Sequence, residues 1–318
     1  MPQPKGLVAV GFQPEGVSIA QVVRDKAQTP QLTVCAFRAC AVADRRKTLQ
    51  ELVKQHALAG ADCVSVLEPG SYQLLQVEAP DVDAAELKAA VRWRVKELID
   101  FHIDDAAIDV FEMPSQGPRA RARIMYVVAA RNPLITQRVE LLQGVGLNLQ
   151  TIDITELALR NITQLLPEDE GGVALLQLSA GEGMITLTRQ ATLYLARNVD
   201  IGVLQLGTVG VGISTDNLAL APQGGRDRAF ETIMLEVQRS FDYYESNFGQ
   251  APIKNLIIGP LAEPQAELAE YAASHLGLKA RGLDLNTVLQ SRAPLDLALQ
   301  ANCISAIGAA LRLEEKAL

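Results

Sequence analysis

A polar bend between two short apolar runs, at residues 7–23 (LVAVGFQPEGVSIAQVV), is the first part of the chain whose residue types could do chemistry. Hairpins of this shape hold a magnesium nucleotide when an Asp orients the metal ion and the backbone N–H groups of a Gly- or Ser-rich bend surround the phosphates. The bend here offers Ala9 and Gly11, followed by Phe-Gln-Pro. Three interpretations therefore stay open: an ordinary turn, a nucleotide site that has lost hydrolysis, and an active ATPase.

Two glutamates, Glu15 and Glu182, lie at bends from which a carboxylate could reach a metal ion in place of the missing Asp. A glutamate at a bend is more often simply solvated. A further acidic group consists of Asp104, Asp105 and Asp109, for which we expect helix or turn capping. We therefore expect no metal site among these residues.

The cysteines and histidines suggest no other chemistry. The four cysteines include no C-x-x-C pair and the three histidines are far apart, so neither set has the spacing of a metal site. A hydrolase would need His102 and Ser240, and neither stands in the context of a nucleophile elbow or a catalytic triad. We therefore predict reduced structural thiols and no catalytic residues.

The composition is that of a globular chain: 318 residues, 48% hydrophobic and 21% charged, with a formal net charge of −8. A chain of this length is expected to form two domains. The acidic balance argues against nucleic acid as a partner, because binding to a phosphate backbone needs clustered positive charge. We find no signal peptide, and the longest uncharged apolar stretch, residues 201–215, is shorter than the roughly 20 residues that span a bilayer. A cytoplasmic protein is expected.

The first half of the chain is predicted to place three strands in succession before a helix. Apolar residues at helical spacing give that helix one buried face, and a Pro-Gly pair marks the turn between the two strands that follow it. The expected strands are residues 7–10, 17–24, 31–38, 63–67 and 72–78, and the expected helix is residues 45–58.

A second helix is predicted to begin at a capping box, in which Asp83 is followed by Glu86 three residues later. Trp93 lies almost opposite the apolar stripe of this helix, at about 100° per residue. An exposed Trp is typical of a partner contact, but packing within the same subdomain is an equal alternative. The residues of the predicted buried stripe are Leu87, Val91, Val95 and Leu98.

Beyond this helix, strands are expected at residues 107–112 and 121–129, separated by a turn at 115–118, and a helix at residues 132–143. Three arginines alternate along the chain near the second strand and would share one of its faces. This row suits a solvated edge strand, an acidic partner or acidic lipid. Its members are Arg119, Arg121 and Arg123.

The second half repeats the pattern of the first, with three strands followed by a long helix and a buried strand. Two such halves with a cleft between them are typical of the actin, sugar kinase and chaperone ATPase architecture, in which each half directs a phosphate-binding hairpin at one nucleotide. The expected strands are residues 172–178, 184–189, 191–198 and 255–258, and the expected helices are residues 227–247 and 303–313.

Four stretches resemble PilM-like type IV pilus assembly proteins, in the same order along the chain. A Trp-containing helix runs into an acidic strand entry, a "GL…D…LAL" connection joins the halves, and an "E-x-x-R-S" helix precedes a closing "GAALR" segment. The stretches are AVRWRVKELIDFHIDDAAIDVF at residues 90–111, LLQGVGLNLQTIDITELAL at 141–159, MLEVQRSFDYY at 234–244 and AIGAALR at 306–312.

The resemblance implies an α/β fold of the actin-like, two-lobed, ribonuclease-H-like duplicated class. We expect the first lobe at residues 1–165, with an inserted subdomain at about 77–150, and the second lobe at residues 166–318. The closing helix at 303–313 is expected to pack back on the first lobe.

The resemblance also implies a role without catalysis. PilM-like proteins lie on the cytoplasmic face of the inner membrane, bind the N-terminal tail of a bitopic PilN-like protein and link it to the pilus motor ATPase. A chain of this size without an anchor is most similar to the members that serve mannose-sensitive haemagglutinin (MSHA) pili. We expect Arg92, Trp93 and Phe101 to contact the partner.

Aligned with nucleotide-binding members of the family, the chain departs from each of three nucleotide elements. Ala9 replaces the Asp of the first "D-I-G", Gln177-Leu178-Ser179 replaces the second, and Gly259-Pro260 replaces a "G-G" turn, in which Pro removes a backbone donor. The degenerate cleft would comprise Gly11, Gln177, Ser179 and Gly259. We expect no ATP or Mg²⁺ as cofactor. Two alternatives remain: a nucleotide-dependent switch, and the cytoplasmic domain of a protein resembling general secretion pathway protein L, which would continue into a membrane helix.

Overall fold

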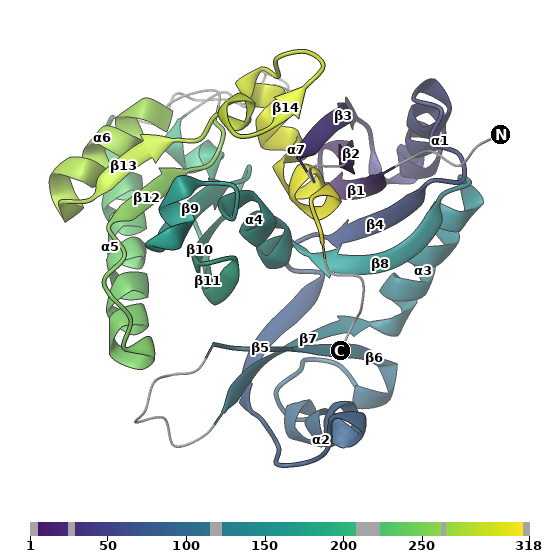
Figure 1. The fold of residues 1–318 in the computed structure, drawn as a ribbon, viewed down its shortest axis with the longest axis horizontal. Coiled ribbons are helices and arrows are strands. Elements are labelled where there is room, and N and C mark those ends of the chain that lie inside the picture. The colour runs from purple at the N-terminus through teal and green to yellow at the C-terminus, as the bar shows by residue number, and fades with distance from the viewer. Residues whose placement is uncertain (1–5, 25–28, 115–122, 208–222, 262–264, 314–318) are drawn as a thin grey trace.

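The computed structural model describes residues 6–24, 29–114, 123–207, 223–261 and 265–313. Two large sheets lie side by side with a pair of helices between them, and a third, smaller sheet extends from the first (Figure 1). Among the described residues, no helix combines the length and the apolar character that crossing a bilayer requires.

The first large sheet has the strand order β14-β3-β2-β1-β4-β8. Helices α1 (Arg45–Gln55) and α3 (Asn132–Gly144) cover one face, because alternate residues of β1, such as Val8 and Val10, pack against Leu49 and Leu142. The strands are β1 (Leu7–Gln13), β2 (Gly16–Arg24), β3 (Pro30–Ala39), β4 (Asp62–Leu67), β8 (Asn148–Ile154) and β14 (Gln290–Ser291).

The second large sheet has the order β11-β10-β9-β12-β13, the same arrangement of a three-strand meander and two parallel strands. Helices α5 (Gln223–Phe248) and α6 (Gln265–Leu276) cover its outer face. The strands are β9 (Val173–Leu178), β10 (Gly183–Arg189), β11 (Thr192–Val199), β12 (Asn255–Ile258) and β13 (Lys279–Gly282). The duplication that the sequence predicts is therefore present.

Helices α4 (Thr155–Thr163) and α7 (Leu297–Ala310) fill the space between the sheets. Their apolar side chains share one buried cluster with residues of both sheets, among them Ala9 and Leu175. The helices approach closely at Gly308, where a Cβ atom would lie 2.0 Å from the backbone oxygen of Ala158. The Asn161 amide donates to the Gly308 carbonyl oxygen at 3.0 Å and fixes the same contact.

The third sheet has the order β5-β7-β6 and carries helix α2 (Ala84–Val95). It leaves the first sheet after β4 and returns through α3 to β8. The Tyr126 hydroxyl donates to the Tyr194 backbone oxygen at 3.0 Å, so this sheet also contacts the second lobe. The strands are β5 (Tyr72–Glu78), β6 (Ala106–Glu112) and β7 (Ile124–Arg131).

Short 3-10 helices complete the elements, at Val42–Asp44 (η1), Ile103–Asp105 (η2), Pro167–Glu170 (η3), Val203–Leu206 (η4) and Leu285–Thr287 (η6). The sequence did not predict β8, α4, α6, β13 or β14. It placed the other strands and helices within a few residues of their observed ends, except for α7. That helix begins at Leu297 instead of residue 303, where the Asp296 carboxylate accepts the Leu299 N–H at 2.7 Å.

Three local predictions are wrong. The Asp83 side chain makes no cap hydrogen bond, so α2 begins without the predicted capping box. Leu98 is 54% exposed because α2 ends at Val95, and Ile99 packs into the core in its place. Arg123 precedes β7 instead of lying within a strand, and it forms an ion pair with Glu112. The turn at 115–118, Arg119 and Arg121 lie outside the described residues.

Candidate functional site

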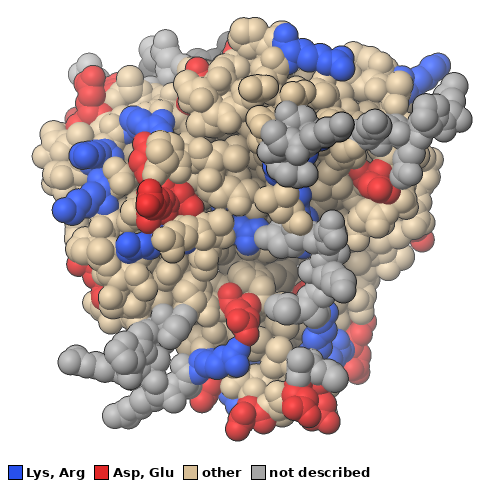
Figure 2. All heavy atoms as spheres, in the orientation of Figure 1, with Lys and Arg blue, Asp and Glu red and all other residues tan. Residues whose placement is uncertain are grey.

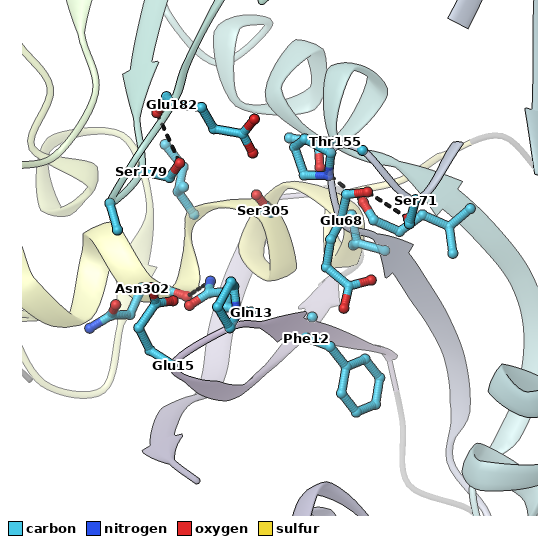
Figure 3. Close-up of a pocket in the computed structure, with 18 of the residues that line it drawn as sticks. Phe12, Gln13, Glu15, Glu68, Ser71, Thr155, Ser179, Glu182, Asn302 and Ser305 are labelled. Atoms are coloured by element: carbon cyan, nitrogen blue, oxygen red, sulfur yellow. Dashed lines mark hydrogen bonds between the residues drawn. The ribbon is translucent and has the colours of Figure 1, made fainter. Parts of the chain in front are cut away.

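A cavity of about 1260 Å³ lies between the two lobes. The β1–β2 bend and the β9–β10 bend face it, and the start of α1, the end of β4, α3 and α7 complete its walls (Figure 3). Two hairpins that converge on one cavity are the arrangement that the duplicated sequence predicts. The bends are therefore where a ligand of the two lobes would be expected.

Ala9, at the position of the Asp expected in a magnesium site, does not line this cavity. It is fully buried in the apolar cluster that joins the first sheet to α7. A carboxylate at this position would be buried among apolar groups, which costs several kcal/mol without a partner. Gly11 does line the cavity, and a Cβ atom there would lie 2.6 Å from the Ser18 hydroxyl.

The side chain and the backbone oxygen of Gln13, in the first bend, are both hydrogen-bonded within the protein. The Gln13 side-chain amide donates to the Asn302 backbone oxygen of α7 at 2.6 Å (Figure 3). The Arg45 guanidinium, at the start of α1, donates to the Gln13 backbone oxygen at 2.7 Å. The bend is thus tied to α1 on one side and to α7 on the other.

Two arginines and a glutamate meet beside this bend. Glu68 follows the end of β4; its Oε1 lies 3.4 Å from Nη1 of Arg45, and its Oε2 lies 2.7 Å from Nη2 of Arg138. The guanidinium of Arg138 lies over the Phe12 ring, 3.9 Å from its centroid. Burial lowers the pKa of Arg138, and the neighbouring Glu68 carboxylate opposes that shift. We refer to Phe12, Arg45, Glu68 and Arg138 as the arginine cluster.

The second bend is closed by Ser179, whose backbone N–H and hydroxyl both donate to the Glu182 backbone oxygen, at 2.8 and 2.9 Å. The neighbouring Gln177 amide donates to the Leu178 oxygen at 3.1 Å. Its Oε1 is buried and has no hydrogen-bond partner among the described residues. This oxygen lies against Gly259, where a Cβ atom would come within 2.0 Å of it.

The four predicted cleft residues are therefore only partly brought together. Gly11, Gln177 and Ser179 line the cavity, whereas Gly259 lies behind the Gln177 side chain and is not part of its wall. The prediction from the sequence did not include Arg45, Glu68 and Arg138 among the residues of the cavity. A signal for one of them was present, since Arg138 lies four residues before Leu142 on the buried face of α3, where an arginine is unexpected.

Glu15 and Glu182, the acids considered as metal ligands, extend into the cavity from opposite bends (Figure 3). Within the described ranges, no three His, Cys, Asp or Glu side chains are grouped so that they could hold a metal ion. Figure 2 shows Lys and Arg interspersed with Asp and Glu on the face it presents. That face offers no continuous basic track.

The three residues predicted to contact a partner lie in α2 and in the segment that follows it, outside the cavity wall. Trp93 is 77% exposed, with the Lys96 ammonium 5.9 Å from its ring centroid. Arg92 donates to the backbone oxygens of Ile103 and Ala106, and Phe101 lies beneath the Arg131 guanidinium at 4.5 Å. Arg92 and Phe101 therefore position the η2 segment, while Trp93 points to solvent.

Buried acids lie where the chain returns from the third sheet. The Tyr72 hydroxyl donates to Oε2 of Glu156 at 2.5 Å and accepts the Thr155 N–H at 3.3 Å. Burial raises the pKa of Glu156, against the effect of the Tyr72 hydrogen bond. Burial likewise raises the pKa of Asp153, which the Arg312 guanidinium opposes. Asp153 and Glu156 lie at this junction, and neither lines the cavity between the lobes.

Comparison with solved structures finds proteins of similar structure. The PilM–PilN type IV pilus biogenesis complex matches with a TM-score of 0.73 and 17% identity, over 98% of this chain and 98% of that one. The cytoplasmic domain of EpsL, an inner-membrane component of the type II secretion system of Vibrio cholerae, matches with a TM-score of 0.48 and 14% identity, over 95% and 94%. A Bacteroides thetaiotaomicron protein with an actin-like ATPase fold matches with 0.49 and 7%, over 93% and 94%.

The actin-like, two-lobed fold class predicted from the sequence is confirmed by the two sheets of matching strand order and by the match to the PilM–PilN complex over 98% of the chain. A search of curated proteins finds no match. The model of the type IV pilus assembly protein PilM family matches residues 46–209, more than half of the 318 residues. This chain belongs to the PilM family of type IV pilus assembly proteins.

Proposed function

We propose that this protein is a non-catalytic adaptor that binds the N-terminal cytoplasmic tail of a PilN-like inner-membrane protein. The observation that carries the proposal is the match over almost the entire chain to a PilM in complex with a PilN. The match covers 98% of this chain and 98% of the chain in the complex, so this chain has nearly the whole fold of that protein.

The finer assignment is also a proposal. We infer that the chain is most like the MSHA pilus biogenesis protein MshI, that it lies at the cytoplasmic face of the inner membrane, and that it links its partner to the pilus motor ATPase. The four quoted sequence stretches support the PilM-like resemblance, and the length of 318 residues supports the MSHA assignment. A bitopic partner would hold the adaptor at the membrane surface.

The absence of catalysis is supported by the two bends. Ala9 is buried in the core, and neither bend carries the Asp of the nucleotide-binding pattern. The carbonyl oxygen of Gln13 accepts from Arg45, and the Gln177 side chain packs against Gly259. Two carboxylates that normally orient Mg²⁺ would have to be replaced by neutral groups.

Calorimetric titration with a synthetic peptide of the PilN-like protein's N-terminal tail tests the proposal. We expect saturable binding without nucleotide, and no saturable binding of a peptide with the same residues in scrambled order. A tail peptide that binds no better than the scrambled peptide, to a protein shown to be folded by circular dichroism, would rule out the adaptor role.

The second candidate is a nucleotide-dependent switch in which binding closes the lobes and changes the affinity for the partner. The size of the cavity and the presence of Glu15 and Glu182 in its wall favour it. Titration with Mg-ATP and with a non-hydrolysable analogue separates the two. The adaptor predicts no saturable heat up to millimolar concentrations, whereas a Kd of about 1 μM, or about 8 kcal/mol, would establish the switch.

A further inference from the structure

We propose that Glu68 acts as an internal anion: its carboxylate occupies the position between Arg45 and Arg138 where the cavity would otherwise bind a polyphosphate. The wild-type cavity therefore rejects phosphate-containing ligands, and removal of the Glu68 charge creates a site for them. This inference concerns the ligand selectivity of the cavity and does not depend on the adaptor role.

The geometry of the arginine cluster supports the first step. Each oxygen of the Glu68 carboxylate faces a different guanidinium, at 3.4 Å to Arg45 and 2.7 Å to Arg138. Convergence of arginines on the oxygens of one anion is how proteins bind phosphate and carboxylate groups. Figure 3 shows Glu68 extending from the end of β4 into the cavity, on the same side as Phe12.

The arginines are held in place independently of Glu68. The Phe12 ring lies beneath both guanidinium groups, 3.9 Å from Arg138 and 5.6 Å from Arg45. Arg45 is also fixed by its bond to the Gln13 backbone oxygen, and the side chain of Arg138 is only 7% exposed. Loss of the carboxylate would therefore leave two preorganised cations beside the β1–β2 bend.

These cations have hydrogen-bonding capacity that the described residues do not use. Nη2 is the one nitrogen of Arg138 with an acceptor in the described part of the chain. Nε of Arg45 is buried, again with no acceptor among the residues that the structure describes. Two guanidinium groups and one carboxylate leave a net charge of one positive unit in the cluster. A phosphate that approaches the arginines nevertheless comes closest to the Glu68 carboxylate, which repels it.

The test uses inorganic pyrophosphate and tripolyphosphate, which carry the anionic chemistry without a nucleoside. Wild type, Glu68→Gln and Glu68→Ala are titrated by calorimetry at low salt. We expect no saturable binding to wild type. Both variants should bind saturably, with a Kd at least tenfold below the highest concentration at which wild type shows no binding. Glu140→Gln is the matched control, because Glu140 lines the same cavity and forms no ion pair among the described residues.

The double variant Glu68→Ala/Arg138→Ala should lose the gained affinity. Folded Glu68 variants that bind pyrophosphate no tighter than Glu140→Gln does would overturn the proposal, and so would wild type that binds as tightly as they do. If a Glu68 variant is unstable, its melting temperature is measured with and without millimolar pyrophosphate. The proposal requires a higher melting temperature with pyrophosphate, and equal values contradict it. Loss of tail-peptide binding would instead concern the adaptor role.

Discussion

Nη1 of Arg312 lies 2.7 Å from Oδ2 of Asp153, in an ion pair that joins the segment just after α7 to the end of β8. The Asp153 side chain is 2% exposed and that of Arg312 is 16% exposed. The pair therefore connects the first sheet to the helix that separates the two lobes, in surroundings where an unpaired charge is costly.

Arg312→Ala should lower the free energy of unfolding at pH 7 by about 3 kcal/mol or more, because it leaves the Asp153 carboxylate buried without its partner. Urea denaturation measures the change. Asp153→Asn in the same background should recover part of the loss, since the remaining side chain is neutral. A loss below about 1 kcal/mol would show that water or another cation compensates Asp153.

Glu156→Gln should remove a pH dependence of stability. The pKa of Glu156 in the folded protein is raised above its ordinary value of 4.5. In the pH window between these two pKa values, the folded protein binds more protons than the unfolded chain. Its free energy of unfolding therefore falls as pH rises through the window. The variant keeps an acceptor for the Tyr72 hydroxyl and should be at least as stable as wild type at pH 7. This advantage should shrink as pH falls towards 4.5, and a constant difference would contradict the raised pKa.

Local patterns explain which parts of the fold the sequence could predict. The hairpin strands alternate or run as short apolar segments between turn residues, and the exposure of Trp93 follows from its angle to Val91 and Val95 on one helix. Leu98 was misplaced because the end of α2 depends on contacts with the third sheet, which periodicity does not report.

The candidate site was less predictable, because its members come from distant parts of the chain. Glu68 and Arg138 meet only when α3 packs beside the end of β4, and neither has a sequence motif. The family pattern did locate both bends. It could not show that Ala9 lies in the core instead of the cavity wall, since this depends on which face of β1 meets α7.

Gly308→Ala should destabilise the protein by about 3 kcal/mol, the upper part of the usual range for overpacking. The new methyl group would meet the Ala158 backbone oxygen, which cannot move unless α4 moves. Ser305→Ala is the control in the same helix; it lines the cavity and should change stability by less than about 0.5 kcal/mol. Equal melting temperatures for the two variants would contradict the close helix contact.

Ala191→Gly should raise the free energy of unfolding by roughly 0.5–1 kcal/mol. Ala191 has φ of 57° in the β10–β11 turn, a conformation that Gly adopts without steric cost, and its N–H bond to the Asp169 carboxylate is retained. Ala196→Gly, in β11, is the matched control and should be destabilising. Stabilisation by both changes would point to an effect unrelated to the turn.

Trp93→Ala should weaken binding of the PilN-like tail peptide at least tenfold, as expected for an exposed aromatic contact. The melting temperature should stay unchanged because the ring is 77% exposed. Leu235→Ala, another exposed apolar residue on α5 of the second lobe, should leave binding unaltered. Unchanged affinity in Trp93→Ala would exclude this ring from the contact and direct attention to the cavity wall.

The position of α7 between the sheets has a consequence for biosynthesis. The first strand ends at Gln13, yet the helix that covers its inner face begins only at Leu297. While the ribosome adds the intervening residues, Ala9 and Ala20 lack the neighbours that bury them in the finished protein. Part of the apolar surface of the amino-terminal lobe therefore stays open to water until residues 297–310 have left the ribosome and formed α7.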